Sequence, residues 1–145
     1  MLVREFMKSG PVSIAPDTPL LEAEWRMQEG GFRHLPVVDG YDRLVGIVSD
    51  RDLREAAPSD ATSLSRQELT YLLSRLTVKD VMSEPVMTAR PGEPAETAAI
   101  RMREHKLGAL PVVEDERIVG IVTTSDMLDA LVRMLKAQRS GARAD

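Results

Sequence analysis

The 145-residue chain contains an internal duplication, and this duplication limits its possible folds more than any other feature. Residues 46–53 read GIVSDRDL, and 74 residues later residues 120–127 read GIVTTSDM. Two more pairs keep this spacing to within one residue: LPVV at residues 35–38 and 110–113, and VREFM and VKDVM at residues 3–7 and 78–82. Two copies with so long a period exclude a solenoid. We therefore expect a duplicated α/β module whose halves pair about a pseudo-two-fold axis.

Each copy has the same expected order of secondary structure. A short extended segment is followed by a proline-containing turn and a helix, and then by a hairpin that starts at LPVV and returns through VGIV. Since both hairpin strands are continuously apolar, we expect them to be covered on both faces. A second helix closes each copy. The expected extended segments are residues 12–14 and 86–88, and the expected closing helices are residues 50–57 and 125–138.

An insert separates the two copies. It opens as a polar loop, and then Ser65 followed by Glu68 predicts a capping box at the start of a short helix. Four leucines share one face of this helix, which we expect to be a linker that packs on the rest of the protein: Leu69, Leu72, Leu73 and Leu76. The expected division is a first unit at residues 1–57, a helical linker at 58–77, a second unit at 78–138 and a disordered tail at 139–145.

The composition argues against several classes of protein. The net charge of −4 and the pI of about 5.3 provide no basic footprint for nucleic acid or for an anionic membrane. No apolar run approaches the ~20 residues of a membrane span. The first ten residues carry charges at Arg4, Glu5 and Lys8, so they do not indicate a signal peptide. We expect a cytoplasmic protein with no nucleic-acid or membrane partner.

Catalysis and metal binding also find little support in the sequence. There is no cysteine, and His34 and His105 are the two histidines, which leaves few ligands for zinc. The sequence contains no glycine-rich phosphate loop, nucleophile elbow or metal-ligand cluster. Asp50 and Asp52 are close in sequence, but at a helix start they face different ways. We therefore expect no enzyme activity, no catalytic residue, no metal site and no required cofactor.

The repeated motifs resemble a tandem pair of CBS domains, also called a Bateman module. Two copies of LPVV, a turn and VGIV[ST]xxD, each preceded by a VxxφM start and a helix, carry this resemblance. The linker and the final helix resemble those of small stand-alone CBS proteins of the acetoin-utilisation type. The resemblance implies two β-α-β-β-α units packed through their sheets, two clefts between them, and often a homodimer. It also implies an adenosyl ligand: AMP, ADP, ATP or S-adenosylmethionine.

The [ST]xxD motif has two interpretations. Ser49 with Asp52, and Thr123 with Asp126, have the spacing of a capping box, in which an acidic residue also suits the helix dipole. Alternatively, a strand that ends where a helix begins attracts phosphate, the hydroxyl donates to a phosphate oxygen, and the aspartate accepts a ribose diol. CBS proteins use the matching residues in this second way. Both roles can coexist, because the cap holds the aspartate in place.

The two copies are not equivalent in the residues expected near phosphate. By resemblance, the position before LPVV faces the phosphates, and it is His34 in the first copy but Ala109 in the second. Arg51 lies within the first [ST]xxD motif and adds a cation. The alternatives are a strand-end histidine bonded to a carbonyl and a solvated helix arginine. The asymmetry favours a phosphate-rich ligand in the first copy and a less charged ligand, or none, in the second.

The resemblance further implies that the adenine half of each cleft comes from the other copy. The walls of the Asp52 cleft would be Met82, Pro85, Val86, Leu107 and Gly108. The walls of the Asp126 cleft would be Met7, Pro11, Val12, Phe32 and Arg33. An alternative for both methionines is ordinary core packing, which methionine does readily.

These observations favour a non-catalytic regulatory module. An adenine nucleotide or another adenosyl compound would bind between the two CBS domains and change their conformation or their oligomeric state. We expect a cytoplasmic homodimer that acts on a separate effector protein. The alternative is a structural or oligomerisation module without a small-molecule ligand, in which the [ST]xxD motifs are only helix caps.

Overall fold

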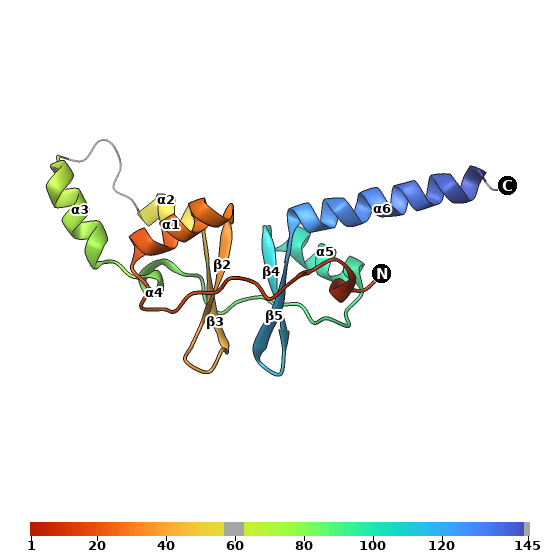
Figure 1. Ribbon diagram of the computed structural model, residues 1–145, viewed down its shortest axis with the longest axis horizontal. Coiled ribbons are helices and arrows are strands. Elements are labelled where there is room, and N and C mark those ends of the chain that lie inside the picture. The colour runs from red at the N-terminus through yellow and green to blue at the C-terminus, as the bar shows by residue number, and fades with distance from the viewer. Residues whose placement is uncertain (57–62, 144–145) are drawn as a thin grey trace. The chain divides into compact units, whose positions relative to one another are not determined.

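The computed structural model describes residues 1–56 and 63–143, and it divides into two compact units (Figure 1). The central unit is Val12–Val86, and the terminal unit combines Met1–Pro11 with Met87–Asp145. This division differs from the repeat boundaries at 1–57 and 78–138. The first segment of each repeat packs on the hairpin of the other repeat, so the N-terminal residues belong with the second copy.

The central unit is built around one antiparallel hairpin. Strands β2 (His34–Val38) and β3 (Leu44–Ser49) pair so that His34 lies opposite Ser49. The helices of this unit are α1 (Leu20–Gly30), α2 (Asp50–Ala56), α3 (Arg66–Arg75) and α4 (Val78–Val81). Helix α1 ends at the two glycines, and Gly31 takes a left-handed φ of 68° that favours glycine.

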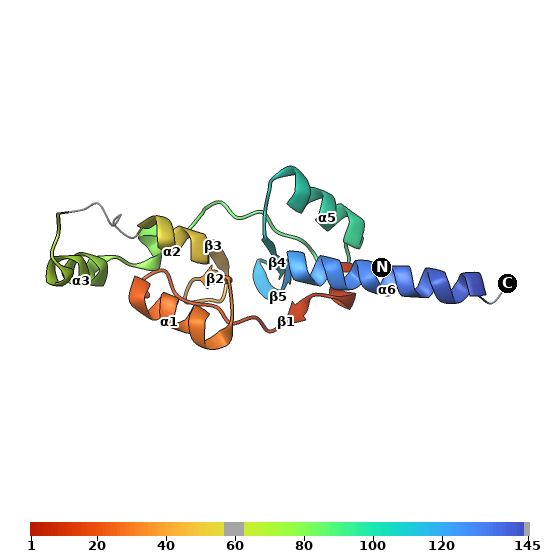
Figure 2. The same ribbon diagram turned by 90° about the horizontal axis from the view of Figure 1, so that it is seen from above.

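The terminal unit contains a three-stranded sheet in the order β1-β5-β4 (Figure 2). Its strands are β1 (Lys8–Ser9), β4 (Ala109–Glu114) and β5 (Arg117–Thr123), all antiparallel to their neighbours. Its helices are a short 3-10 helix (Val3–Glu5), α5 (Ala95–Glu104) and α6 (Thr124–Arg143). Ala109 lies opposite Thr123, which repeats the register of His34 and Ser49.

Each unit has its own core. In the central unit, buried side chains of α1, β2 and β3 pack around Val78, which comes from the second repeat. In the terminal unit, side chains of α5, β4 and β5 pack around Val3 and Phe6, which come from the first repeat. Burial of these apolar residues holds the exchanged segments in place.

The predicted extended segments at residues 12–14 and 86–88 do not form strands. Ile14 makes a single parallel bridge to Val37, and Ala89, one residue beyond the second range, makes the equivalent bridge to Val112. A proline follows each bridge two residues later and has no backbone N–H to continue the ladder.

The final helix is longer than the sequence predicts. Helix α6 runs to Arg143, so the prediction of a disordered tail is wrong for residues 139–143, and residues 144–145 lie outside the described residues. Good helix formers continue past Gln138, and the single Gly141 costs only about 1 kcal/mol relative to alanine, which does not end a long helix. Figure 1 shows α6 continuing well beyond the β4–β5 hairpin.

The linker helix forms where the sequence predicts it. The hydroxyl of Ser65 accepts a hydrogen bond from the backbone N–H of Glu68 at 3.2 Å. Leu73 is partly buried, whereas Leu72 is exposed, so the apolar face is narrower than expected. Residue 57 of the predicted α2 and residues 58–62 of the linker lie outside the described residues.

Candidate ligand site

The junction of β3 and α2 in the central unit forms a complete capping box. The backbone N–H of Ser49 donates to Oδ2 of Asp52 at 2.8 Å, and Oγ of Ser49 accepts from the backbone N–H of Asp52 at 3.1 Å. This confirms the capping interpretation of the [ST]xxD spacing. Within residues 1–56 and 63–143, the hydroxyl hydrogen of Ser49 and Oδ1 of Asp52 have no partner. Both therefore remain free for a ligand.

His34 lies beside this junction, as the phosphate hypothesis requires. It is directly opposite Ser49 in the β2–β3 register and is partly buried. Burial lowers the pKa of the His34 imidazole from 6.5, and this outweighs the opposing effect of the charges of Asp50 and Asp52. The imidazole has no hydrogen bond to the described part of the chain, so the carbonyl-bonded alternative is not seen. A neutral His34 retains one N–H that can donate to phosphate.

Arg51 is directed elsewhere. Its Nε donates to Oε1 of Glu55 at 3.0 Å, one turn along α2, and its side chain is 78% exposed. This pair matches the alternative of a solvated helix arginine. A role for Arg51 in binding phosphate stays a prediction.

The equivalent junction in the terminal unit has the same cap but no free carboxylate oxygen. Oδ2 of Asp126 accepts from the backbone N–H of Thr123 at 2.8 Å and from its hydroxyl at 3.0 Å. Oδ1 of Asp126 accepts from Nζ of Lys8 at 2.6 Å. Asp126 is buried, with 5% of its side chain exposed. The capping prediction is confirmed here too. The contact of Lys8 was not predicted from the sequence. The available signal was that the matching position of the other repeat holds Ser83, which has no charge.

Both predicted adenine-pocket methionines pack inside a unit. A Cβ built on Gly46 would lie 2.5 Å from Sδ of Met82, and a Cβ on Gly120 would lie 2.5 Å from Sδ of Met7. Each methionine is partly buried against the core of its unit. This supports the core-packing alternative, and the adenine role of the methionines stays a prediction.

The other predicted pocket residues divide between the units. The central unit contains Asp52 together with Pro85 and Val86, and the terminal unit contains Asp126 together with Pro11. The remaining predicted residues belong to the other unit from their assigned aspartate and stay predictions: Leu107 and Gly108 for Asp52, and Val12, Phe32 and Arg33 for Asp126.

Arg33 and Gly108, two of the predicted adenine-pocket residues, use their carbonyl groups within their own units. The carbonyl of Arg33 accepts from the N–H of Asp50 at 2.9 Å, and that of Gly108 accepts from the N–H of Thr124 at 3.1 Å. These bonds join the start of α2 to the residue before β2, and the start of α6 to the residue before β4. The carbonyl of Gly108 also accepts from the hydroxyl of Thr124 at 3.3 Å, whereas that of Arg33 can accept a second hydrogen bond. Recognition of an adenine edge by these residues stays a prediction.

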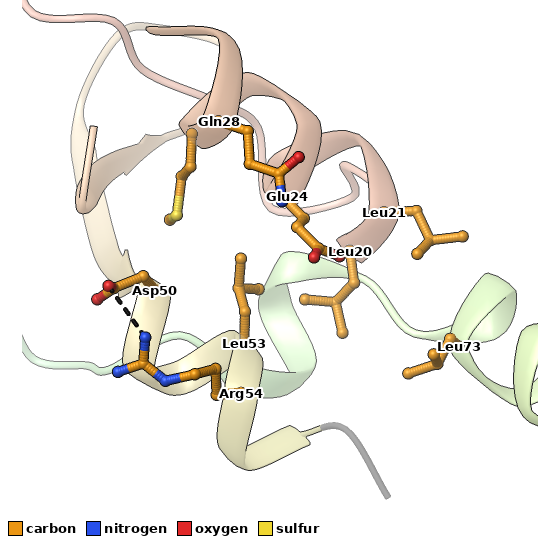
Figure 3. A pocket seen from close by; sticks show the side chains of 9 residues that line it. Leu20, Leu21, Glu24, Gln28, Asp50, Leu53, Arg54 and Leu73 are labelled. Atoms are coloured by element: carbon orange, nitrogen blue, oxygen red, sulfur yellow. Dashed lines mark hydrogen bonds and ion pairs between the residues drawn. The ribbon is translucent and has the colours of Figure 1, made fainter. Parts of the chain in front are cut away.

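A separate pocket of about 350 Å³ lies between the helices of the central unit (Figure 3). Its apolar side chains come from α1 (Leu20, Leu21 and Met27), α2 (Leu53) and α3 (Leu73). An ion pair between Arg54 and Asp50, at 3.3 Å, lies along one side. The pocket includes neither Ser49 nor Asp52, and the sequence did not predict it.

The described residues were also considered for a metal site and for a helix that could span a membrane. Residues 1–56 and 63–143 contain no group of three or more His, Cys, Asp or Glu that could hold a metal ion. The same residues include no helix that is long and apolar enough to cross a membrane.

Comparisons with known proteins identify the repeat. The CBS domain family model matches residues 3–59 and 78–133. A CBS domain-containing protein of Dictyostelium discoideum is 34% identical over 137 residues, which cover 94% of each chain. The chain also matches larger enzymes, such as the L-aspartate semialdehyde sulfurtransferase of Methanocaldococcus jannaschii, at 29% identity over 127 residues. It spans about a fifth of the length of that enzyme, since it covers 22% of it.

Solved structures share the fold. A Vibrio cholerae protein assigned to acetoin utilization is 32% identical, with a TM-score of 0.79 and coverage of 97% of this chain and 96% of that one. The CBS domain pair of protein MJ0100, in complex with 5'-methylthioadenosine and S-adenosyl-L-methionine, has a TM-score of 0.78 at 28% identity, covering 92% and 98%. CBSX2, in complex with AMP, has a TM-score of 0.75 at 30% identity, covering 92% and 97%.

The family match and the similar structures agree with the repeated LPVV and VGIV[ST]xxD motifs and with the α/β architecture of both units. The chain therefore belongs to the CBS domain family and carries two CBS domains in tandem.

Proposed function

We propose that this CBS pair is a non-catalytic regulatory module that binds an adenine nucleotide, with Asp52 holding the ribose and Ser49 and His34 holding the phosphate. The observation that carries the proposal is the set of free groups at the β3–α2 junction. Oδ1 of Asp52 and the hydroxyl hydrogen of Ser49 have no partner in the described part of the chain, while the cap fixes both side chains.

The chemistry of these groups fits a nucleotide. A free carboxylate oxygen accepts hydrogen bonds from a ribose diol, and a hydroxyl and an imidazole N–H donate to phosphate oxygens. Because the capping box exists without ligand, little ordering of these side chains is needed on binding. His34 gains a proton most readily next to a phosphate, which adds charge to the contact.

The similar structures support an adenosyl ligand. The CBS pair of protein MJ0100 was solved with 5'-methylthioadenosine and S-adenosyl-L-methionine, and CBSX2 was solved with AMP. All three ligands contain an adenine base joined to a ribose ring. For the present protein we favour AMP, ADP or ATP, because His34 and Ser49 lie side by side, and we keep S-adenosylmethionine as the alternative ligand.

The regulatory step is also a proposal. Binding would shift the population of conformations or of oligomers, to the extent that the ligand binds one state more tightly than the other. We propose a cytoplasmic homodimer that acts on a separate effector protein, with no nucleic-acid or membrane partner. A structural or oligomerisation module without ligand is the second candidate, since both capping boxes are complete on their own.

A thermal-shift panel tests the proposal. AMP, ADP, ATP and S-adenosylmethionine are added to the wild-type protein and to the Asp52→Asn variant, in which the amide oxygen can still accept the capping bond from Ser49. A nucleotide at 100 times its Kd stabilises the wild type by about 2.7 kcal/mol. We expect a shift for the wild type that Asp52→Asn abolishes. If no compound shifts the wild type, the proposed function is wrong and the second candidate is favoured. Product formation would instead show an enzyme.

A further inference from the structure

We propose that the ion pair of Lys8 with Asp126 prevents ribose from binding in the terminal unit. Each chain would then have one adenosyl site, at Asp52. This inference rests on the proposed function. It assigns to Lys8 a role in determining which of the two motifs binds ligand.

The contacts of Asp126 carry the inference. Its two oxygens accept three hydrogen bonds: two from Thr123 to Oδ2, and one from the ammonium group of Lys8 to Oδ1 at 2.6 Å. A carboxylate has about four acceptor positions, so one remains, whereas a ribose diol brings two O–H donors. The bond from Lys8 joins two charges and is of the strong class. A ribose could bind only by displacing the lysine.

Displacing the lysine is costly because of where the two charges lie. The side chain of Asp126 is 5% exposed, whereas that of Lys8 is 65% exposed. The ammonium group therefore returns easily to solvent, but the carboxylate would stay buried without an opposite charge. Neutral ribose hydroxyls do not replace that charge.

The central unit supplies a direct comparison. Lys8 pairs with Ile121 of β5, and Ser83, the matching residue of the second repeat, pairs with Ile47 of β3 in the same way. Ser83 carries no charge, and Oδ1 of Asp52 is without a partner among the described residues. One difference between the two junctions is therefore a backbone-equivalent position that holds lysine in the terminal unit and serine in the central unit.

The hydroxyl groups of the two motifs also differ in their hydrogen bonding. The hydroxyl of Thr123 donates to Asp126, so its hydrogen is used, whereas that of Ser49 is not used within the described residues. Ala109 stands where the central unit has His34 and has no group for phosphate. Three separate features therefore leave the terminal junction with fewer free groups.

A reciprocal exchange of the two residues tests the inference by isothermal titration with AMP and S-adenosylmethionine. In the Asp52→Asn background, Lys8→Ser opens the terminal site, so we expect binding to become about tenfold tighter or more, the effect of one charge-assisted hydrogen bond. In the opposite direction, Ser83→Lys in the wild-type background supplies an ammonium group to Asp52 and weakens binding by a similar factor. Replacement of the exposed Lys79 by serine is the matched control for charge.

The outcomes separate this inference from the proposed function. If the wild type binds neither compound, the proposed function is wrong and the inference falls with it. If the wild type binds but Asp52→Asn and Asp52→Asn/Lys8→Ser bind equally, or not at all, Lys8 does not close the terminal site. Two equal sites per wild-type chain would also overturn it. Circular dichroism checks that each variant is folded, and the Ser83→Lys arm stands if Lys8→Ser does not fold.

Discussion

Met82 occupies the space that a side chain on Gly46 would need: an added Cβ would lie 2.5 Å from Sδ of the methionine. The same relationship joins Met7 to Gly120 in the other unit. Because the glycine of the GIV[ST] motif has no side chain, the methionine that ends the VxxφM motif can pack directly against it. The two repeated motifs depend on each other, and each methionine comes from the other repeat.

Replacement of Gly46 by alanine is therefore expected to destabilise the protein. Met82 is partly buried and has to move to relieve the contact, and overpacking of this kind costs about 1 kcal/mol or more. Urea unfolding followed by circular dichroism measures the change. Gly40→Ala is the control, because a Cβ at Gly40 meets nothing within 4 Å. Equal effects of the two replacements would contradict the close packing at Gly46.

Replacement of Ser49 by alanine should affect both stability and ligand binding. Loss of the cap costs about 1 kcal/mol, and loss of the hydroxyl removes a donor to phosphate. We expect weaker binding of AMP but little change for adenosine, which has no phosphate. Thr123→Ala removes the equivalent cap in the terminal unit and is expected to reduce stability without changing the affinity for AMP. If Ser49→Ala binds AMP as tightly as the wild type, the hydroxyl is only a cap.

His34 should make the stability depend on pH. Burial lowers its pKa in the folded protein below 6.5, so the unfolded chain binds more protons as the pH falls through this range. The free energy of unfolding should therefore fall as the pH decreases from above 6.5 toward the lowered pKa. In His34→Gln this part of the pH dependence should disappear. Urea unfolding at a series of pH values measures the difference from the wild type.

The control for this experiment is His105→Gln, since His105 is an exposed residue at the end of α5. Because the carboxylates are the same in all three proteins, their contribution cancels in the comparison. A wild-type slope that His105→Gln removes, and His34→Gln retains, would contradict the assignment to buried His34.

The local parts of the fold were predictable from the sequence. The caps at Ser49 and Thr123 depend on residues three positions apart, and the hairpins depend on consecutive apolar runs, so short patterns determine them. The contact of Lys8 with Asp126 joins residues 118 positions apart. Such a contact depends on which repeat the N-terminal segment packs against, and neither periodicity nor spacing carries that information.

The domain boundaries predicted from the sequence do not include the exchange of segments, for the same reason. Val3 and Val78 begin the similar motifs VREFM and VKDVM, so the local sequence does not show which hairpin each valine packs against. Only the tertiary packing distinguishes the two arrangements. The resemblance to CBS pairs nevertheless placed Met82 with Asp52 and Met7 with Asp126, and these groupings agree with the composition of the two units.

Isothermal titration of AMP into the wild type, Asp52→Asn and Asp126→Asn decides whether Asp52 holds the ribose. We expect one AMP per wild-type chain, loss of binding in Asp52→Asn, and an unchanged affinity in Asp126→Asn, where Lys8 already occupies the aspartate. If Asp52→Asn binds AMP as the wild type does, or if Asp126→Asn alone loses binding, the assignment of the nucleotide site to the central unit is wrong.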